Sequence, residues 1–230
     1  RPPLAVRSVP RRKARVLIDL AREAMVTRER DLDAFVHADE RDVRLVEFGD
    51  GLQFACYGTT PERRQMLDAV YGFLVLMNGV PTGYVLSASL LGSTEIAYNI
   101  FATDRGAAAA RLFGVTVAMV RHLFGSDTFV LDPYQLGHDN QEGLKSGAWW
   151  FYYKLGFRPR DPQVRRVLHG ELAQMKRNPR HRSTRSTLEK LASAHLYFES
   201  RPSRTPVPHP PWEIGTHISN VLAAHSGAGR

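Results

Sequence analysis

The sequence contains a single cysteine, Cys56, so no disulfide can form within the chain. The apolar neighbours of Cys56 predict a buried thiol, and one unpaired thiol is typical of a protein kept in the reducing cytoplasm. No apolar run approaches the ~20 residues of a membrane-spanning helix, so we expect no membrane partner. The first residues, Arg1-Pro2-Pro3, contain neither an initiator Met nor the apolar core of a signal peptide, as expected of a fragment of a longer chain.

The sequence also lacks the spacings that mark several kinds of catalytic site. Lys145 is followed by Ser146 and Gly147, but the glycines of a phosphate-binding loop do not precede it. No serine lies in a nucleophile elbow, which removes support for that class of hydrolase. The C-terminal histidines show no metal-ligand spacing, so we predict no metal: they are His169, His195, His209, His217 and His225.

The composition is that of a globular protein with a basic surface. With 230 residues, 43% of them hydrophobic, the chain can bury one substantial core. The formal net charge of +8 favours an anionic partner, without choosing between a nucleic acid, a phosphorylated cofactor and a membrane surface. Much of the excess charge lies in residues 177–185, which we interpret as a solvated linker. Few aromatic residues interleave these arginines, and this disfavours a nucleic acid as the partner.

Apolar periodicity predicts an order of helices and strands along the first two thirds of the chain. Asn78-Gly79 between two apolar runs is the strongest hairpin signal in the sequence, and Gly49-Asp50-Gly51 marks an earlier turn. The predicted elements are helices within 12–36, strands at 43–48, 52–57, 73–77, 84–88 and 95–101, a helix at 105–124 and a strand at 128–131.

The last third of the chain predicts two helices and an extended tail. Asp161 is placed to cap a helix that begins at Pro162 and continues to Met175. Ser186 followed by Glu189 fits a capping box for the second helix. Residues 201–211 contain five prolines without an apolar period, which is typical of an extended linker.

The most informative segment is residues 148–157, Ala-Trp-Trp-Phe-Tyr-Tyr-Lys-Leu-Gly-Phe. With Leu144 in front of it, this segment predicts a helix whose apolar stripe faces a core: Leu144, Ala148, Phe151 and Leu155. Gly156 can take the left-handed conformation that ends a helix, and Phe157 can fold back onto the last turn. The pattern therefore predicts a helix, a stop and then a strand, with the Trp and Phe rings in the core.

Tyr152 lies beside that stripe and is a candidate for chemistry. A buried phenol needs a hydrogen-bond partner or a ligand, and it can deliver a proton to a departing thiolate.

Residues 100–110 join a strand to a helix through small side chains, Ile-Phe-Ala-Thr-Asp-Arg-Gly-Ala-Ala-Ala-Ala. Small residues leave the amides of Gly106 to Ala110 open, and the positive end of the helix dipole favours a pyrophosphate there. The same composition also suits close packing of an Ala-rich helix on the sheet, so both interpretations stay open at this point.

Together the two segments resemble the GCN5-related N-acetyltransferase (GNAT) superfamily. The aromatic helix is similar to that family's pattern of Ala, Phe-Tyr and Leu-Gly-Phe. Arg105, Ala108 and Ala110 fall on its acyl-CoA signature, Arg/Gln-x-x-Gly-x-Gly/Ala. Ala108 takes the place of the first Gly, and the extra methyl group makes CoA affinity the property that this departure affects. Ala102 stands where the family commonly has Pro.

The resemblance covers residues 73–157 and implies an α/β fold of three layers. It implies a mixed central sheet of about six strands flanked by helices, with extra C-terminal helices. We divide the chain accordingly into N-terminal helices at 1–40, a GNAT-like core at 41–160, a C-terminal helical extension at 161–198 and a Pro-rich tail at 199–230.

The resemblance further implies an enzyme, an acyl-CoA-dependent N-acyltransferase that moves an acyl group, most simply acetyl, directly to an amine. Tyr152 would protonate the CoA sulfur, and a backbone amide near Ile100 or Phe101 would stabilise the oxyanion. Glu95 is the preferred general base, ahead of Asp132 and His138. The residues expected to contact the acyl-CoA are Ile100, Phe101, Ala102, Arg105, Gly106, Ala107, Ala108, Ala109, Ala110 and Asn140.

Two other functions remain open from the sequence. The first is a catalytically degenerate GNAT-fold domain that binds a partner protein, in which Ala108 records a lost pyrophosphate site. The second, which the sequence favours less, is a basic nucleic-acid-binding protein that uses residues 177–185. In the enzyme, the amine acceptor could be a small molecule or a protein.

Overall fold

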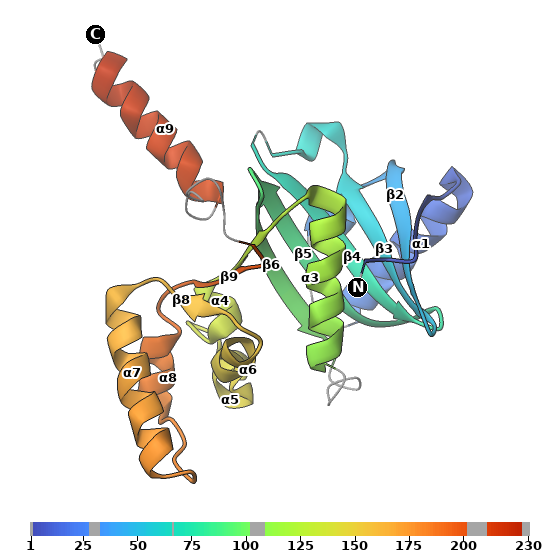
Figure 1. Cartoon of the computed structure of the whole chain (residues 1–230). Coiled ribbons are helices and arrows are strands. Elements are labelled where there is room, and N and C mark those ends of the chain that lie inside the picture. The colour runs from blue at the N-terminus through green and yellow to red at the C-terminus, as the bar shows by residue number, and fades with distance from the viewer. Residues whose placement is uncertain (1, 28–32, 66, 102–108, 202–210, 227–230) are drawn as a thin grey trace. The chain divides into compact units, whose positions relative to one another are not determined.

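The structure is a computed structural model that describes residues 2–27, 33–65, 67–101, 109–201 and 211–226. The chain divides into two units: Arg1–Asp127 with Arg204–Arg230, and Thr128–Ser203. Figure 1 colours both units along the chain. In the part of the chain that the structure describes, no helix is both long and apolar enough to cross a bilayer.

Six strands of the first unit form a meander in which each strand pairs with the next in sequence, always antiparallel. They are β1 (Ala5–Ser8), β2 (Ala38–Gly49), β3 (Leu52–Thr59), β4 (Ala69–Met77), β5 (Val80–Leu90) and β6 (Ser93–Ile100), with a 3-10 turn, η1 (Pro61–Arg63), between β3 and β4.

Positive backbone angles close the tight turns between these strands. Asn78 and Gly79 have φ of 51° and 81° and join β4 to β5, which confirms the predicted hairpin. Leu91 and Gly92, with φ of 49° and 79°, join β5 to β6 in the same way. The meander therefore follows from local turn chemistry.

Helices cover both faces of this sheet. The buried side of α1 (Arg11–Val26) packs with Leu45, Tyr57 and Leu74, and α2 (Asp33–Val36) adds Phe35 to the same cluster. Phe73 directly precedes Leu74 on β4 and so points to the other face of the sheet, where its ring contacts Phe124 of α3 (Ala109–Phe124). The first unit thus has the three layers that were expected.

The second unit contains short strands and many short helices. Its strands run antiparallel in the order β7 (Thr128–Leu131), β9 (Leu196–Glu199) and β8 (Arg158–Pro159). Its helices are α4 (Pro133–Leu136), α5 (Gln141–Ser146), α6 (Ala148–Lys154), α7 (Pro162–Arg177) and α8 (Arg185–Leu191). Beyond this unit, residues Pro211–Ser226 form α9.

The α/β class is confirmed, but the expected number of about six strands is wrong. The described strands number nine, six in the first unit and three in the second. The strands β1 and β9 were not predicted, because both are too short to show a pattern of alternating apolar residues. Each is defined by its pairing with a strand that is distant in the sequence. The division at residue 128 falls within the predicted 41–160 core, and the domain bounds stay a prediction.

The helix caps of the second unit confirm one prediction and correct another. The Asp161 carboxylate accepts the N–H groups of Gln163 and Val164 at 2.8 and 2.9 Å, so Asp161 caps α7 as expected. The predicted Ser186 cap of the next helix is wrong. Thr184 caps α8 instead, and its hydroxyl accepts the N–H of Thr187. Both residue types cap helices well, so the sequence pattern alone did not separate them.

Candidate functional site

The aromatic segment forms a helix that ends as the sequence predicts. Gly156 has a φ of 103°. The N–H of Phe157 donates to the carbonyl of Tyr152 at 3.2 Å, and the N–H of Gly156 donates to that of Tyr153 at 3.1 Å. These two bonds make a Schellman motif. β8 begins at Arg158, so the predicted order of helix, stop and strand is confirmed.

The start of the helix differs from the prediction. Gly147 has a φ of 69°, which separates α5 from α6 and shifts the phase between Leu144 and the aromatic residues. Trp149 and Tyr152 are therefore the buried residues of α6, at 1% and 3% exposure, whereas Phe151 is only half-buried. The predicted stripe of Leu144, Ala148, Phe151 and Leu155 is wrong because it assumed one continuous helix.

Tyr152 has a defined polar partner. Its phenol oxygen accepts an N–H from Nε2 of Gln135 on α4 at 3.1 Å. Burial raises the pKa of the Tyr152 phenol, and the hydrogen bond from Gln135 opposes this with a smaller lowering. The phenol is therefore held in its protonated form with its oxygen already accepting one hydrogen bond.

Gln135 was not foreseen from the sequence, because no motif connects it to Tyr152. The signal that could have found it is Asp132-Pro133, which starts α4. The Asp132 carboxylate accepts the N–H of Tyr134 at 2.8 Å and so caps this single turn. A residue three positions after the cap, such as Gln135, then occupies a fixed place on the turn.

Asp132 also pairs with a histidine from the far end of the unit. Nε2 of His195 lies 3.6 Å from Oδ2 of Asp132, with 21% and 37% of the two side chains exposed. The pKa of Asp132 is lowered, chiefly by His195 and further by the N–H of Tyr134, against an opposing effect of burial. No sequence pattern indicated this pair, because His195 stands just before the unpredicted strand β9.

Asn140, predicted to contact the cofactor, holds the backbone around α5. Its Oδ1 accepts the N–H of Gly143 at 3.1 Å, and its Nδ2 donates to the carbonyl of Tyr134 at 3.0 Å. Two of the predicted site residues, Asn140 and Tyr152, lie in the second unit. Asn140 bonds to Tyr134 of α4, and Tyr152 bonds to Gln135 of the same helix.

The other described site residues lie on β6 and α3 of the first unit. Glu95 is half-buried and is paired across the strands with Ala88. It shares a face of β6 with Asn99, which donates to the Tyr84 hydroxyl at 3.3 Å. Tyr98 faces the opposite side, where its ring contacts Phe113 of α3.

The ends of β6 and α3 are fixed by specific bonds. The Tyr98 hydroxyl donates to the carbonyl of Ala109 at 3.2 Å, which holds the start of α3 against β6. The N–H of Phe101 donates to the carbonyl of Thr82 at 2.9 Å. Because alternate residues of an antiparallel strand point their backbone groups to opposite edges, the N–H of Ile100 is directed away from β5.

The remaining predicted cofactor contacts, Ala102, Arg105, Gly106, Ala107 and Ala108, lie outside the described residues. Ala109 is half-buried and Ala110 is exposed at the first described turn of α3. Cys56 is buried as predicted, and burial raises the pKa of its thiol. The described residues hold no group of three or more His, Cys, Asp or Glu side chains arranged to bind a metal ion.

Comparisons with known proteins give a likeness in structure but none in sequence. No protein-family model matches the chain, and no curated protein matches its sequence. One similar solved structure is yncA from Salmonella typhimurium, named "a putative acetyltransferase" and solved with acetyl-CoA. It is 12% identical, with a TM-score of 0.39, over 88% of this chain and 97% of that one. A likeness at this level does not assign a function.

Proposed function

We propose that this protein is an acyl-CoA-dependent N-acyltransferase of the GNAT type that moves an acyl group, most simply acetyl, directly to an amine. The observation that carries the proposal is the Tyr152 phenol. It is buried on a helix closed by Leu155-Gly156-Phe157, and its oxygen accepts an N–H from Gln135.

Tyr152 is the proposed general acid. Its oxygen accepts the Gln135 N–H, so its own hydrogen must point in another direction, and in the proposed reaction that O–H donates to the leaving sulfur. In the reaction a C–N bond forms, the C–S bond breaks and the phenol proton passes to the thiolate. The phenolate is stabilised by the N–H of Gln135 until it regains a proton from solvent. We therefore assign Gln135 a positioning role.

A backbone amide at the end of β6, at Ile100 or Phe101, is the proposed oxyanion stabiliser. The N–H groups of these two residues are directed to opposite edges of the strand. A preoriented amide of this kind is suited to the charge that develops on a thioester carbonyl. The acyl-CoA itself would supply the activated thioester, with Arg105 to Ala110 and the start of α3 around its pyrophosphate.

The general base has two candidates. Glu95 keeps its place as a half-buried carboxylate on the strand that leads into the signature. The Asp132–His195 pair is the second candidate. A carboxylate beside an imidazole orients the ring, and Asp132 caps the same short helix that carries Gln135.

The test is an acetyl-CoA titration followed by Trp fluorescence, together with turnover on a broad panel of amines. We expect saturable binding, and we expect Tyr152→Phe to lower kcat by about 10- to 100-fold while changing acetyl-CoA affinity little. Tyr153→Phe is the matched control, since Tyr153 is the next residue and stacks on Trp149. No saturable binding at millimolar acetyl-CoA would reject the proposal. Binding without transfer to any amine would favour the degenerate GNAT-fold domain instead.

A further inference from the structure

The second unit contains a cavity of about 600 Å³ outside the residues proposed for acyl transfer. The segment between α4 and α5, helix α5, helix α7 and helix α8 line it. This volume lies within the range of small-molecule sites. Its apolar lining is Leu144 and Val164, both buried, together with the half-buried Val167.

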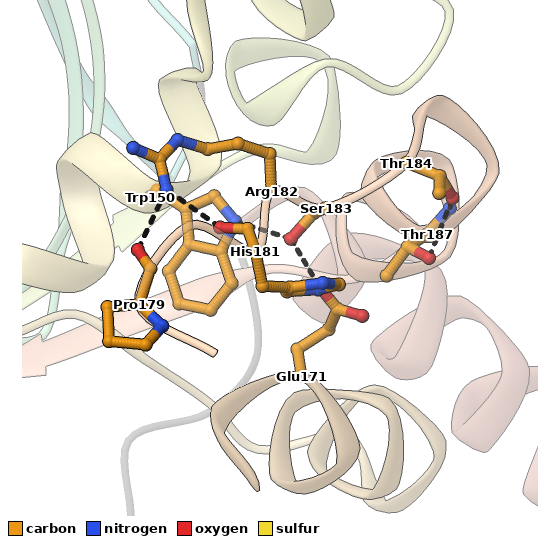
Figure 2. Close-up of polar contacts among 8 residues, drawn as sticks. All are labelled: Trp150, Glu171, Pro179, His181, Arg182, Ser183, Thr184 and Thr187. Carbon is orange, nitrogen blue, oxygen red and sulfur yellow. Dashed lines mark hydrogen bonds and ion pairs between the residues drawn. The ribbon is translucent and has the colours of Figure 1, made fainter. Parts of the chain in front are cut away.

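A polar network fixes the wall that α8 provides. Figure 2 shows Ser183 between Trp150 and Glu171. The Trp150 indole N–H donates to the Ser183 hydroxyl at 3.0 Å, and that hydroxyl donates to Glu171 Oε2. Nε2 of His181 lies 3.0 Å from the same carboxylate oxygen. Glu171 is 6% exposed on α7, so the residues just before α8 are anchored to a buried group.

The charged side chains that line the cavity differ in whether an oppositely charged group lies beside them. The Glu189 carboxylate accepts from Arg185 at 2.9 Å, and the exposed Asp139 carboxylate lies 3.7 Å from Nε2 of His138, a contact between opposite charges only when that ring is protonated. Lys190 also lines the cavity, and no carboxylate among the described residues pairs with its ammonium. The site therefore offers an apolar floor, the Lys190 ammonium and neutral polar groups from Gln141, Gln163, Ser186 and Ser193.

We propose that this cavity binds an apolar carboxylic acid of roughly the size of an N-acyl amino acid. The aliphatic or aromatic body lies on Leu144, Val164 and Val167, and the carboxylate pairs with Lys190. The neighbouring hydroxyl and amide side chains take the remaining polar groups of the ligand. The site is separate from Tyr152, Gln135, Glu95 and the Asp132–His195 pair, none of which lines it, although His138, a base candidate ranked below Glu95 from the sequence, does.

The probe is N-acetyl-leucine, with N-acetyl-leucinamide as the matched ligand that lacks the carboxylate. An NMR titration of the intact chain follows the backbone amides of Gln163 and Lys190. We expect saturable shifts with a Kd of about 1 mM for the acid. Because an exposed ion pair is worth at most about a factor of five, the amide should bind about fivefold more weakly.

Two variants separate the site from the surface charge. Lys190→Gln should weaken the acid about fivefold and leave the amide unchanged, whereas Lys176→Gln, an exposed change on α7 away from the lining, should alter neither by more than about twofold. Val167→Glu places a carboxylate on the floor and should abolish binding, with the unfolding midpoint as a check on its fold. Equal binding of acid and amide, equal effects of the two Lys variants, or no saturable shift at 20-fold the expected Kd would each overturn the proposal.

Discussion

In the first unit, the carboxylate of Asp42 accepts the Tyr71 hydroxyl at 2.8 Å and lies 3.2 Å from Arg44 and 3.9 Å from Arg64. In the second unit, the carboxylate of Glu171 bonds to Ser183 and His181. The arginines are 43% and 52% exposed, so water can replace Asp42 as their partner. His181 is 19% exposed and has less access to water, so the loss of Glu171 should be the more damaging.

The two units also bury apolar area in different ways. In the first unit, strands of up to 12 residues place alternate side chains on two helix-covered faces, so many residues share the core. The strands of the second unit have two to four residues, and its largest fully buried side chain is a single ring, Trp149 of α6. The second unit should therefore depend more strongly on single residues.

The largest expected effect tests that dependence. Trp149 is 1% exposed and stacks on Tyr153 at 5.4 Å between ring centroids. Trp149→Ala should lower the free energy of unfolding by about 3–5 kcal/mol, because it leaves a cavity where an indole was fully packed. The measurement is urea denaturation, with hydrogen exchange showing whether protection is lost in β7 and β9.

The matched control for that variant is Trp150→Phe in the same helix. Trp150 is half-buried, and its replacement removes the bond to Ser183 while keeping a ring. We expect a loss of about 1 kcal/mol. If Trp149→Ala cost no more than Trp150→Phe, the second unit would not depend on its buried ring as argued above.

Alkaline pH should have the next largest effect, in both units. Burial raises the pKa of Tyr57 in the first unit and of Tyr152 in the second. An unfolded Tyr ionises near pH 10, so the folded state keeps its full advantage below that pH and loses it as the pH rises toward the folded pKa. At pH 11 each of these phenols should cost about 1.4 kcal/mol. Thermal unfolding between pH 8 and 11 measures the slope.

Replacing each tyrosine tests whether its phenol causes the loss of stability at alkaline pH. Tyr57→Phe and Tyr152→Phe should each remove a similar part of the loss between pH 10 and 11, although Tyr57→Phe also gives up the bond from its hydroxyl to the Leu17 carbonyl. An unchanged slope in both variants would mean that other groups cause the alkaline loss.

Replacing the carboxylates of Glu171 and Asp42 should have a smaller effect, and one that differs between the two units. Glu171→Gln should lower the free energy of unfolding by about 1–3 kcal/mol, because the Ser183 hydroxyl and the His181 ring lose a charged acceptor in a poorly hydrated place. Asp42→Asn should cost less than about 1 kcal/mol, because its arginine partners can turn to water. Chemical denaturation of the two variants side by side is the measurement, and a larger cost for Asp42→Asn would reverse the comparison.

Local signals in the sequence predicted the elements that they determine and missed those set by distant contacts. Asn78-Gly79, the Asp161 cap and Leu155-Gly156-Phe157 each produced the expected turn, cap or stop, because the backbone of these few residues decides the outcome. By contrast, β9 exists through its pairing with β7 and β8, which lie far from it in the sequence. The break at Gly147 was missed because the helical period continued through it.

The candidate site divides in the same manner. Tyr152 could be singled out because it belongs to a recognisable helix ending. Gln135 and His195 could not, since their relation to Tyr152 and Asp132 exists only once α4 is capped and β9 is paired. Part of the acyl-CoA signature, residues 102–108, lies outside the described residues, so its role rests on the sequence.

The smallest expected effect concerns the basic segment 177–185, which was interpreted as a solvated linker. Arg182 donates to the carbonyls of Pro179 and His181, and Arg185 pairs with Glu189 one turn later on α8. An exposed Arg before a Glu at this spacing is the weaker orientation, and Arg185 also lies at the positive end of the helix dipole. Arg185→Gln should therefore change stability by less than about 0.5 kcal/mol.

The same variant sharpens the choice of partner for this segment. The Arg182 guanidinium has N–H donors engaged by local carbonyls, and the charge of Arg185 is partly balanced by Glu189. Oligonucleotide binding should therefore be weak and should not depend on Arg185. The measurement is fluorescence anisotropy of a labelled oligonucleotide at several salt concentrations. Tight oligonucleotide binding whose affinity falls steeply with salt, with a smaller salt dependence in Arg185→Gln, would contradict this expectation. The segment would then be a phosphate-binding surface.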